Sequence, residues 1–326
     1  MTKKLCQYLV LLRPFGVTPE QIHSEVGSFG VPEFGTKFVR GMLIDTRPTT
    51  FDELIRISGL SHGTDVWLGN AQSLIEAGTV TLQDAICCRD DIMIYLIKQG
   101  LPPNPAFKIM ETVRKGKALK DPEKWAEYVA LMKEHDVPDW YIKSCEKIKY
   151  MFPKAHAAAY VTNAFRIAWF KVHQPLAYYA SYFSIRADEF DSECMIFGKE
   201  KVKNKMKEID LQGNAATVKD KNMYAILELV LEMYERGFNF LPMDLYQSDS
   251  TKFLVEENGI RPPLNSIPGL GTVAAQGIVK ARQEGKFMSI DDLKIRSKVG
   301  NSVTDLLKAF GCLDGMSQSN QMSLFG

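Results

Sequence analysis

Residues 152–160 read Phe-Pro-Lys-Ala-His-Ala-Ala-Ala-Tyr, and no other stretch of the chain is as informative. Pro153 suits the entrance of a helix, because its fixed φ fits there and its missing N–H is not needed. Lys154 and His156 would then lie in or near the first turn, where free backbone N–H groups and the helix dipole favour an anion. Tyr160 follows His156 by four residues and shares its helix face. The spacing therefore suits a triphosphate that carries a sugar and a base.

Spacing alone also allows a second interpretation of this stretch. Tyr160, Ala164, Phe165 and Trp169 recur at helical spacing, which is typical of a helix packed on a core. In that case the stretch is a well-capped core helix with a solvated lysine. The choice between a nucleotide-binding helix and a core helix therefore depends on residues outside this stretch.

Composition limits the class of protein. The 326 residues are 45% hydrophobic, enough for two domains or one large domain with an appendage, and no run of 18 apolar residues predicts a transmembrane helix. The six cysteines are scattered without a C-x-x-C pair, which indicates reduced thiols and gives no zinc signal. The adjacent Cys87 and Cys88 are typical of a buried helix. We therefore expect a cytoplasmic protein without a membrane partner.

The distribution of charge is more informative than the net charge of +1. Residues 143–173 contain six lysines or arginines and one acid, and residues 107–120 contain five against one. Separated basic patches on a nearly neutral chain fit a polyanionic partner, although any one patch is equally well a solvated helix face.

The chain predicts a mainly α-helical fold. Thr18 precedes Pro19 as an N-cap, Thr50 and Glu53 form a capping box, and Thr81 to Asp84 predicts a third helix start. Further helices are expected at 105–116, 122–135, 138–150, 155–174 and 225–237, and residues 251–255 and 259–261 are expected to form a β-hairpin.

Residues 264–282 look like a helix-hairpin-helix motif. Gly269 and Gly271 allow a tight turn, and the N–H groups from Leu270 through Val273, Thr272 included, would point outward at the start of the second helix. Such a turn binds a phosphate without reading bases. Lys280 and Arg282, near the far end of that helix, would add positive charge.

A second copy of this motif is expected between residues 290 and 310. It places Gly300 before its second helix but lacks the leading glycine, so we expect its phosphate binding to be weaker or absent. The alternative role of this copy is to complete the core of a tandem unit. Both copies would hold duplex DNA without sequence preference, with an affinity that falls steeply with salt.

These motifs occur within a wider resemblance. The segments 141–160, 168–175, 31–40 and 57–67 closely resemble the fingers of the C-family bacterial replicative DNA polymerases, in the PolC type of Gram-positive bacteria. The resemblance runs from about Gly16 to Gly326 and corresponds to the C-terminal part of that polymerase III alpha subunit. The first dozen residues do not match.

The resemblance implies roles for particular residues. Lys154, His156 and Tyr160 would line the incoming dNTP, with Lys154 opposing the phosphates. The remaining candidates for the nucleotide- or template-binding surface are Lys143, Lys147, Lys149 and, on a predicted loop from Ser58 to Thr64, Ser61 and His62.

The C-terminal residues resemble a clamp-binding motif. Gln321, Leu324 and Phe325 are similar to the Gln-x-x-Leu-Phe sequence by which bacterial polymerases bind the sliding clamp. The two apolar residues would enter a pocket of the clamp, and the glutamine would hydrogen-bond at its rim.

The resemblance also implies what the chain lacks. Polymerases of this family hold two Mg²⁺ ions on palm carboxylates, and the palm precedes the region that the resemblance covers. We therefore expect no catalytic and no metal-binding residue here, and a fragment of a DNA-directed DNA polymerase that is inactive alone. The main alternative is a free-standing, non-catalytic adaptor that links duplex DNA to the sliding clamp. A third, an unrelated helical enzyme using His62 and His156, is least favoured.

The predicted organisation has five parts. These are an atypical start (1–15), polymerase fingers (16–212), a connecting helix with a β-like segment (213–262), a tandem helix-hairpin-helix domain (263–315) and a clamp-binding tail (316–326). Template and duplex DNA, dNTP, the clamp and other replisome subunits are the expected partners.

Overall fold

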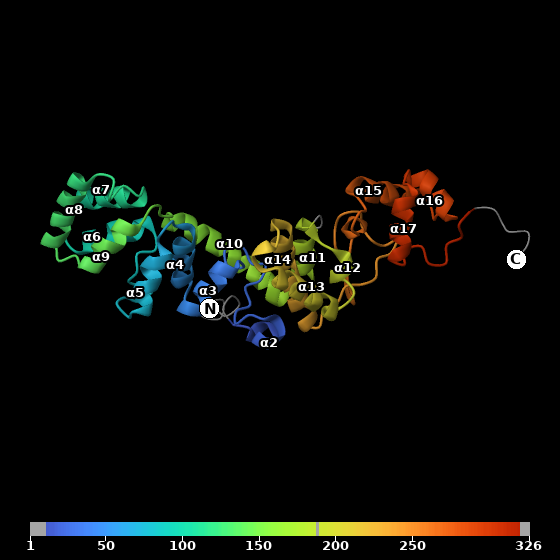
Figure 1. Ribbon diagram of the computed structural model, residues 1–326, viewed down its shortest axis with the longest axis horizontal. Coiled ribbons are helices and arrows are strands. Elements are labelled where there is room, and N and C mark those ends of the chain that lie inside the picture. Colours follow the sequence, from blue (N-terminus) through green and yellow to red (C-terminus); the bar gives the residue numbers. More distant parts are fainter. Residues whose placement is uncertain (1–10, 187–188, 320–326) are drawn as a thin grey trace, which may run out of the picture. The chain divides into compact units, whose positions relative to one another are not determined.

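The computed structural model describes residues 11–186 and 189–319, and it confirms the mainly α-helical class (Figure 1). The N-terminal half contains α2 (Pro19–Ile22), α3 (Lys37–Thr46), α4 (Phe51–His62), α5 (Gln72–Glu76), α6 (Arg89–Lys98), α7 (Pro103–Arg114), α8 (Pro122–Glu134), α9 (Asp139–Lys147) and α10 (Lys154–His173). The C-terminal half contains α11 (Pro175–Ile185), α12 (Ser192–Met195), α13 (Lys199–Gln212), α14 (Val218–Glu235), α15 (Thr272–Ala281), α16 (Ile290–Ser297) and α17 (Asn301–Ala309). Its strands, β1 (Leu254–Glu256) and β2 (Gly259–Arg261), pair antiparallel, as the predicted hairpin requires.

The chain divides into two compact units. Among the described residues, the first contains 11–14 and Glu25–Trp169, and the second contains Phe15–Ser24, 170–186 and 189–319. The division falls within α10, whereas the predicted boundary at residue 212 lies inside the second unit, at the end of α13.

Local capping explains most helix starts. Thr18 and Gln21 form a capping box on α2, and Thr50 and Glu53 form one on α4, as predicted. The predicted helix start at Thr81 is wrong. Asp84 accepts hydrogen bonds from the N–H and hydroxyl of Thr81, but the chain makes only a turn there, and the next helix, α6, begins at Arg89.

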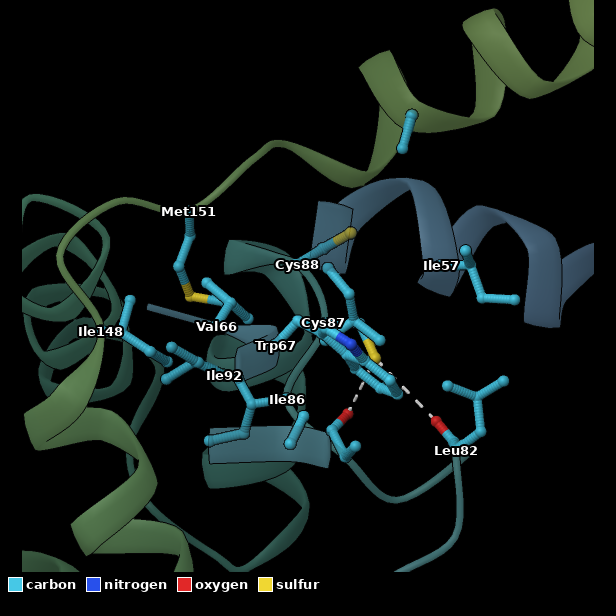
Figure 2. Packing of buried hydrophobic residues seen from close by; sticks show 14 of the residues in the cluster. Ile57, Val66, Trp67, Leu82, Ile86, Cys87, Cys88, Ile92, Ile148 and Met151 are labelled. Atoms are coloured by element: carbon cyan, nitrogen blue, oxygen red, sulfur yellow. Dashed lines mark hydrogen bonds between the residues drawn. The ribbon is translucent and has the colours of Figure 1, made fainter. Parts of the chain in front are cut away.

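The core of the first unit surrounds the Cys87–Cys88 pair. Both side chains are fully buried, and the Cys87 thiol donates to the carbonyl oxygen of Ala85, 3.3 Å away (Figure 2). The pair precedes α6 and is not helical, which corrects that part of the prediction. Burial, with the nearby Asp91 carboxylate, raises the pKa of the Cys87 thiol to about 12, so it stays protonated and unreactive near neutral pH.

Gly59 allows α4 to approach this cysteine pair. A Cβ atom at residue 59 would lie 2.7 Å from the carbonyl oxygen of Cys87 and would also collide with the Cys88 sulfur. The Gly59→Ala variant is therefore expected to lose about 1–3 kcal/mol of unfolding free energy through overpacking, measured by urea denaturation. Gly41→Ala is the matched control, because Gly41 lies inside α3 with nothing within 4 Å of its added Cβ. The control should gain about 0.5–1 kcal/mol, and equal gains from both variants would contradict this packing.

The second unit is centred on α11 and α14. Four rings, from Phe183, Phe190, Phe240 and Phe253, contact one another with centroids 4.8 to 6.1 Å apart. α13 packs antiparallel to α14 after the turn at residues 213–217. Thr217 caps α14, which begins at Val218, seven residues before the predicted start at residue 225.

A buried ionic network holds the end of α10 to α14 within this unit. The Lys171 ammonium lies 2.8 Å from one carboxylate oxygen of Glu232, and both side chains have zero exposure. The Tyr179 hydroxyl donates to the other Glu232 oxygen at 2.6 Å, and Arg236 donates to Tyr179 at 2.9 Å and to the Lys171 carbonyl at 3.0 Å. Burial, together with the charge of Glu232, raises the pKa of Tyr179 well above its usual range.

The last part of the second unit has its own small core. α15, α16 and α17 bury Leu270, Ile278, Leu293 and Leu307, among other residues. α15 and α16 approach closely at Gly277, where an added Cβ would lie 2.8 Å from the Ser297 carbonyl oxygen. Two short helical hairpins therefore share one core, as a tandem motif predicts.

Candidate functional site

The start of α10 carries a row of ring side chains. Phe152 lies just before the helix, and its ring contacts His156 at a centroid distance of 5.1 Å, while His156 contacts Tyr160 at 4.7 Å. On the other side, the imidazole of His62 stacks on Phe152 at 4.9 Å. The structure thus brings together three predicted residues, His62, His156 and Tyr160, and adds Phe152 as the ring that joins them.

His62 is oriented by a carboxylate from outside its helix. Its Nε2 atom contacts the Glu33 carboxylate, which also accepts a hydrogen bond from the Ser58 hydroxyl at 3.3 Å. Glu33 adopts φ +69°, a left-handed conformation that is uncommon for glutamate. The predicted loop from Ser58 to Thr64 is wrong in its first part, because His62 is the last residue of α4. Ser61, in the same turn, donates its hydroxyl to the Ser58 carbonyl.

Lys154 is the first residue of α10, and carboxylates of its own unit surround it. Its ammonium lies 3.4 Å from Asp91 and 3.5 Å from Asp52, and its backbone N–H donates to Asp90 at 2.7 Å. Burial lowers the pKa of Lys154, but Asp91 and Asp52 outweigh that effect and raise it overall. The expectation of a free N–H at this position is therefore wrong, because the Asp90 carboxylate already caps it.

The other predicted lysines lie apart from Lys154. Lys143 is exposed on α9, and Lys147 donates to the Gly69 carbonyl at 2.7 Å. Lys149 pairs with Asp65 at 2.6 Å. Lys147 and Lys149 line a hollow of about 650 Å³, and Lys154 lines a different pocket with which that hollow shares no residue.

The first hairpin has the predicted turn. Gly269 adopts φ +88°, Leu270 is buried, and Gly271 is the N-cap of α15, whose first residue is Thr272. No side chain of the described residues caps this helix. Its first N–H groups are thus suited to an external anion.

The two basic residues of this hairpin differ. Lys280 is exposed near the end of α15. Arg282 is half-buried, and its guanidinium donates to the carbonyls of Leu245 and Ser248 at 2.7 Å each, while burial lowers its pKa. Arg282 thus holds the preceding loop, and its place on the DNA-binding surface stays a prediction.

The second hairpin repeats the same backbone pattern. Lys298 adopts φ +58° where the first hairpin has Gly269, Val299 is buried, and Gly300 is the N-cap of α17. The missing glycine therefore does not prevent the turn from forming. In place of that glycine the second hairpin has Lys298, two residues before the N-cap of α17.

Three further predictions concern the clamp-binding motif, metal binding and membrane spans. Gln321, Leu324 and Phe325 lie outside the described residues. Within the described part of the chain, no cluster of three or more His, Cys, Asp or Glu side chains is placed to hold a metal ion. In the same residues, no helix is both long and apolar enough to cross a membrane.

Sequence reasoning did not find the partners of Lys154 and His62. Asp52, Asp90 and Asp91 are more than 60 residues from Lys154, and Glu33 is 29 residues from His62. The only local signals of the three aspartates are the acidic first turns of α4 and α6, which capping already explains. Long-range pairing of this kind has no signature in helical periodicity.

Two families match parts of the chain. Residues 18–136 match the bacterial DNA polymerase III alpha subunit finger domain, and residues 237–323 match the helix-hairpin-helix motif. The matched ranges differ from the predicted limits of 16–212 and 263–315. The first part of the chain is thus similar to that finger domain and the last part to a helix-hairpin-helix unit.

Longer relatives specify the family further. The chain is 59% identical over 310 residues to DNA polymerase III PolC-type of Oceanobacillus iheyensis, 54% over 323 to that of Caldanaerobacter subterraneus and 58% over 310 to that of Bacillus subtilis. These alignments cover 95%, 99% and 95% of this chain, but 21%, 23% and 21% of the relatives. Over almost its whole length the chain is thus a homologue of part of the PolC-type DNA polymerase III family, and it spans about a fifth of the length of these relatives.

Proposed function

We propose that this chain supplies the fingers and a duplex-binding domain of a replicative DNA-directed DNA polymerase. The observation that carries the proposal is the 54% identity to a PolC-type polymerase over 323 residues, a span that includes the ring row at α10, together with the finger-domain and hairpin matches elsewhere in the chain. Stacking rings next to a lysine suit a base with phosphates attached.

The nucleotide would be bound at the start of α10. His156 and Tyr160 offer ring faces and hydrogen-bonding atoms, and His62 extends the row through Phe152. Lys154 is held by Asp52 and Asp91, so a triphosphate would replace those carboxylates as its partner. Lys143, Lys147 and Lys149 would then attract template or phosphate more diffusely.

Lys154→Ala is expected to raise the apparent KM for nucleotide roughly 10- to 100-fold, in a protein that joins this segment to a catalytic palm. The estimate is the loss of one charge-assisted hydrogen bond. Affinity for DNA should be nearly unchanged, and Lys219→Ala, which removes an exposed lysine of α14 that has no proposed role, is the control. Primer-extension kinetics would measure both, and equal KM values for Lys154→Ala and the parent protein would refute the assignment.

The two hairpins would bind phosphates of the duplex. Gly269, Leu270, Gly271 and Thr272 form the first turn and Gly300 the second, and Lys280 adds an exposed charge. Such contacts read no bases, so binding is independent of sequence and falls with salt.

The C-terminal motif would attach the chain to the sliding clamp. Deleting residues 321–325 is expected to abolish binding to the clamp while leaving duplex affinity within about twofold, because hairpin phosphate contacts are independent of the tail. Surface plasmon resonance on immobilised clamp and on immobilised duplex would measure the affinity for each partner. Ser323→Ala is the control, and loss of both activities on deletion would contradict a modular tail.

The remaining parts of the proposal concern the intact enzyme. Mg²⁺ would be held by palm carboxylates outside the described residues, so this chain by itself should bind duplex without extending a primer. Its other partners would be dNTP and further replisome subunits, and its location would be the bacterial cytoplasm.

A further inference from the structure

A hollow of the first unit, at the end of α9, brings together two exposed leucines from distant parts of the chain. Leu68 and Leu119 both line this cavity of about 650 Å³, and Ile148 lines it as well. Leu68 is 62% exposed and Leu119 is 66% exposed, whereas Ile148 is 1% exposed. Single exposed leucines are common on proteins, but exposed apolar side chains that share one hollow are typical of an interaction site.

A kink in the chain presents Leu68 to solvent. Leu68 has ψ 129° and Gly69 has φ +66°, so neither residue is helical. Asn70 anchors the kink to α9, because its buried side-chain amide donates to the Ser144 carbonyl at 3.2 Å and accepts from the Ser144 hydroxyl at 2.7 Å. A wall that is fixed before binding reduces the conformational entropy lost when a ligand docks.

Both carboxylates that line the hollow are already engaged. Asp65 pairs with the Lys149 ammonium at 2.6 Å, and Glu146 accepts a hydrogen bond from the indole N–H of Trp125 at 2.9 Å. Three lysines line the hollow against these two carboxylates, so its charge is positive.

The unpaired charge belongs to Lys120 and Lys147, which are both exposed. Among the described residues, neither ammonium has a carboxylate within ion-pair distance. Lys147 donates one of its three protons to the Gly69 carbonyl at 2.7 Å, which leaves two for an anion. The hollow therefore combines an apolar surface with two lysines that an acidic partner could reach.

The lining favours a peptide over a nucleic acid. Single-stranded nucleic acids bind proteins largely by stacking on aromatic side chains, and none of the described residues that line the hollow is aromatic. The last residues of this chain, 316–326, contain no aspartate or glutamate that could pair with the lysines. An acidic segment with apolar side chains complements both the charge and the leucines.

We propose that this hollow docks an acidic segment of a partner protein. Apolar side chains of that segment would pack on Leu68 and Leu119, and its carboxylates would pair with Lys120 and Lys147. The ring row at α10 and Lys154 line no part of the hollow, so the inference does not rest on the proposed nucleotide site. It assigns Lys147 a more specific role than diffuse attraction of the template.

Fluorescence anisotropy on the full chain tests the docking site. The probe is a fluorescein-labelled hexapeptide of two leucines flanked on each side by two aspartates. One matched peptide replaces the leucines by serines, another replaces the aspartates by asparagines, and labelled hexathymidylate is the nucleic-acid arm. We expect the acidic leucine peptide to bind about tenfold more tightly than either matched peptide, with an affinity that falls with salt.

Variants connect the binding to the hollow. Leu119→Ser and Leu68→Ser are each expected to weaken the peptide about tenfold and to leave Tm unchanged, because the replaced side chains are exposed. Lys120→Glu should weaken the peptide about tenfold and reduce the salt dependence. Leu211→Ser and Lys219→Glu change an exposed leucine and an exposed lysine of the second unit, and they should have no effect.

The outcomes separate a peptide site from a general basic surface. Peptide binding that both leucine variants and Lys120→Glu weaken, with the two controls unchanged, supports the proposal. Hexathymidylate binding that Lys120→Glu weakens and Leu119→Ser does not, without peptide binding, would assign the surface to nucleic acid and overturn it. Peptide binding weaker than a Kd of about 1 mM, or equal in the parent protein and both leucine variants, would overturn it as well.

Discussion

Replacing Glu232 by leucine is expected to destabilise the second unit by about 3–5 kcal/mol. The variant leaves Lys171, which is fully buried, without its carboxylate, and removes the acceptor of the Tyr179 hydroxyl. Arg236, 3.9 Å from Glu232, loses its nearest anion as well. Burial of unpaired charge is far more costly than the loss of an exposed ion pair, so this is the largest stability effect expected in the chain.

Two further variants separate charge from packing. The double variant Lys171→Met/Glu232→Leu removes both charges and should recover part of the lost stability, because an apolar pair can replace a buried ion pair. Glu208→Gln breaks an exposed pair with Lys205 and should change the unfolding free energy by less than about 1 kcal/mol. Urea denaturation gives these values, and a single Glu232→Leu variant no less stable than Glu208→Gln would contradict the network.

Replacing Thr272 by glutamate is expected to weaken duplex binding roughly 10- to 100-fold, the cost of one charge-assisted contact with the phosphate. The position is the first residue of α15, after the N-cap Gly271. A carboxylate there stabilises the helix through its dipole, so folding should be unaffected or improved. The same carboxylate would repel the phosphate that the proposed function places at this turn.

Two variants serve as controls in the same gel-shift measurement. Gln276→Glu adds the same charge to an exposed site one turn further along α15 and should weaken binding far less. Lys298→Gly removes a charge from the second hairpin but suits its left-handed backbone. It should reduce the salt dependence by about one phosphate contact if both hairpins bind. Equal losses for Thr272→Glu and Gln276→Glu would indicate a general charge effect and contradict binding at the turn.

Local signals in the sequence predicted much of the fold. Capping residues such as Thr18 and Thr50, and Pro19 directly after Thr18, mark helix starts that the structure confirms. The signal at Thr81 failed because the same hydrogen bonds from threonine to Asp84 stabilise a lone turn. The same side-chain hydrogen bonds occur at a helix N-terminus and in an isolated turn. Tertiary packing determines which of the two forms, so the local sequence does not distinguish them.

Contacts of the candidate site between residues close in sequence were predicted, and contacts between distant residues were missed. His156 and Tyr160 share a face because they are four residues apart, and their ring contact confirms it. The Asp90 cap on Lys154 and the Glu33 contact of His62 come from distant parts of the chain. Such contacts depend on how α4 and α6 pack near the start of α10, and periodicity does not encode that packing.

The second hairpin shows how residue type and backbone can diverge. Its lack of a leading glycine led us to expect weaker or absent phosphate binding, yet Lys298 adopts the left-handed conformation that Gly269 adopts in the first hairpin. The strain of about 1 kcal/mol for a non-glycine residue there is small against the shared core of Val299, Leu307 and their neighbours. The missing glycine therefore does not prevent the turn, and the weaker phosphate binding stays a prediction.

The most direct test of the account is a gel-shift titration of the purified chain on primer–template duplex at two salt concentrations, with primer extension measured in parallel. The account predicts tight binding at low salt that falls steeply at high salt, independent of sequence, with no extension. Binding that is absent or insensitive to salt would contradict the duplex-binding role. Extension of the primer would show that catalytic carboxylates lie within this chain, and the assignment of α10 and its neighbours to fingers would be wrong.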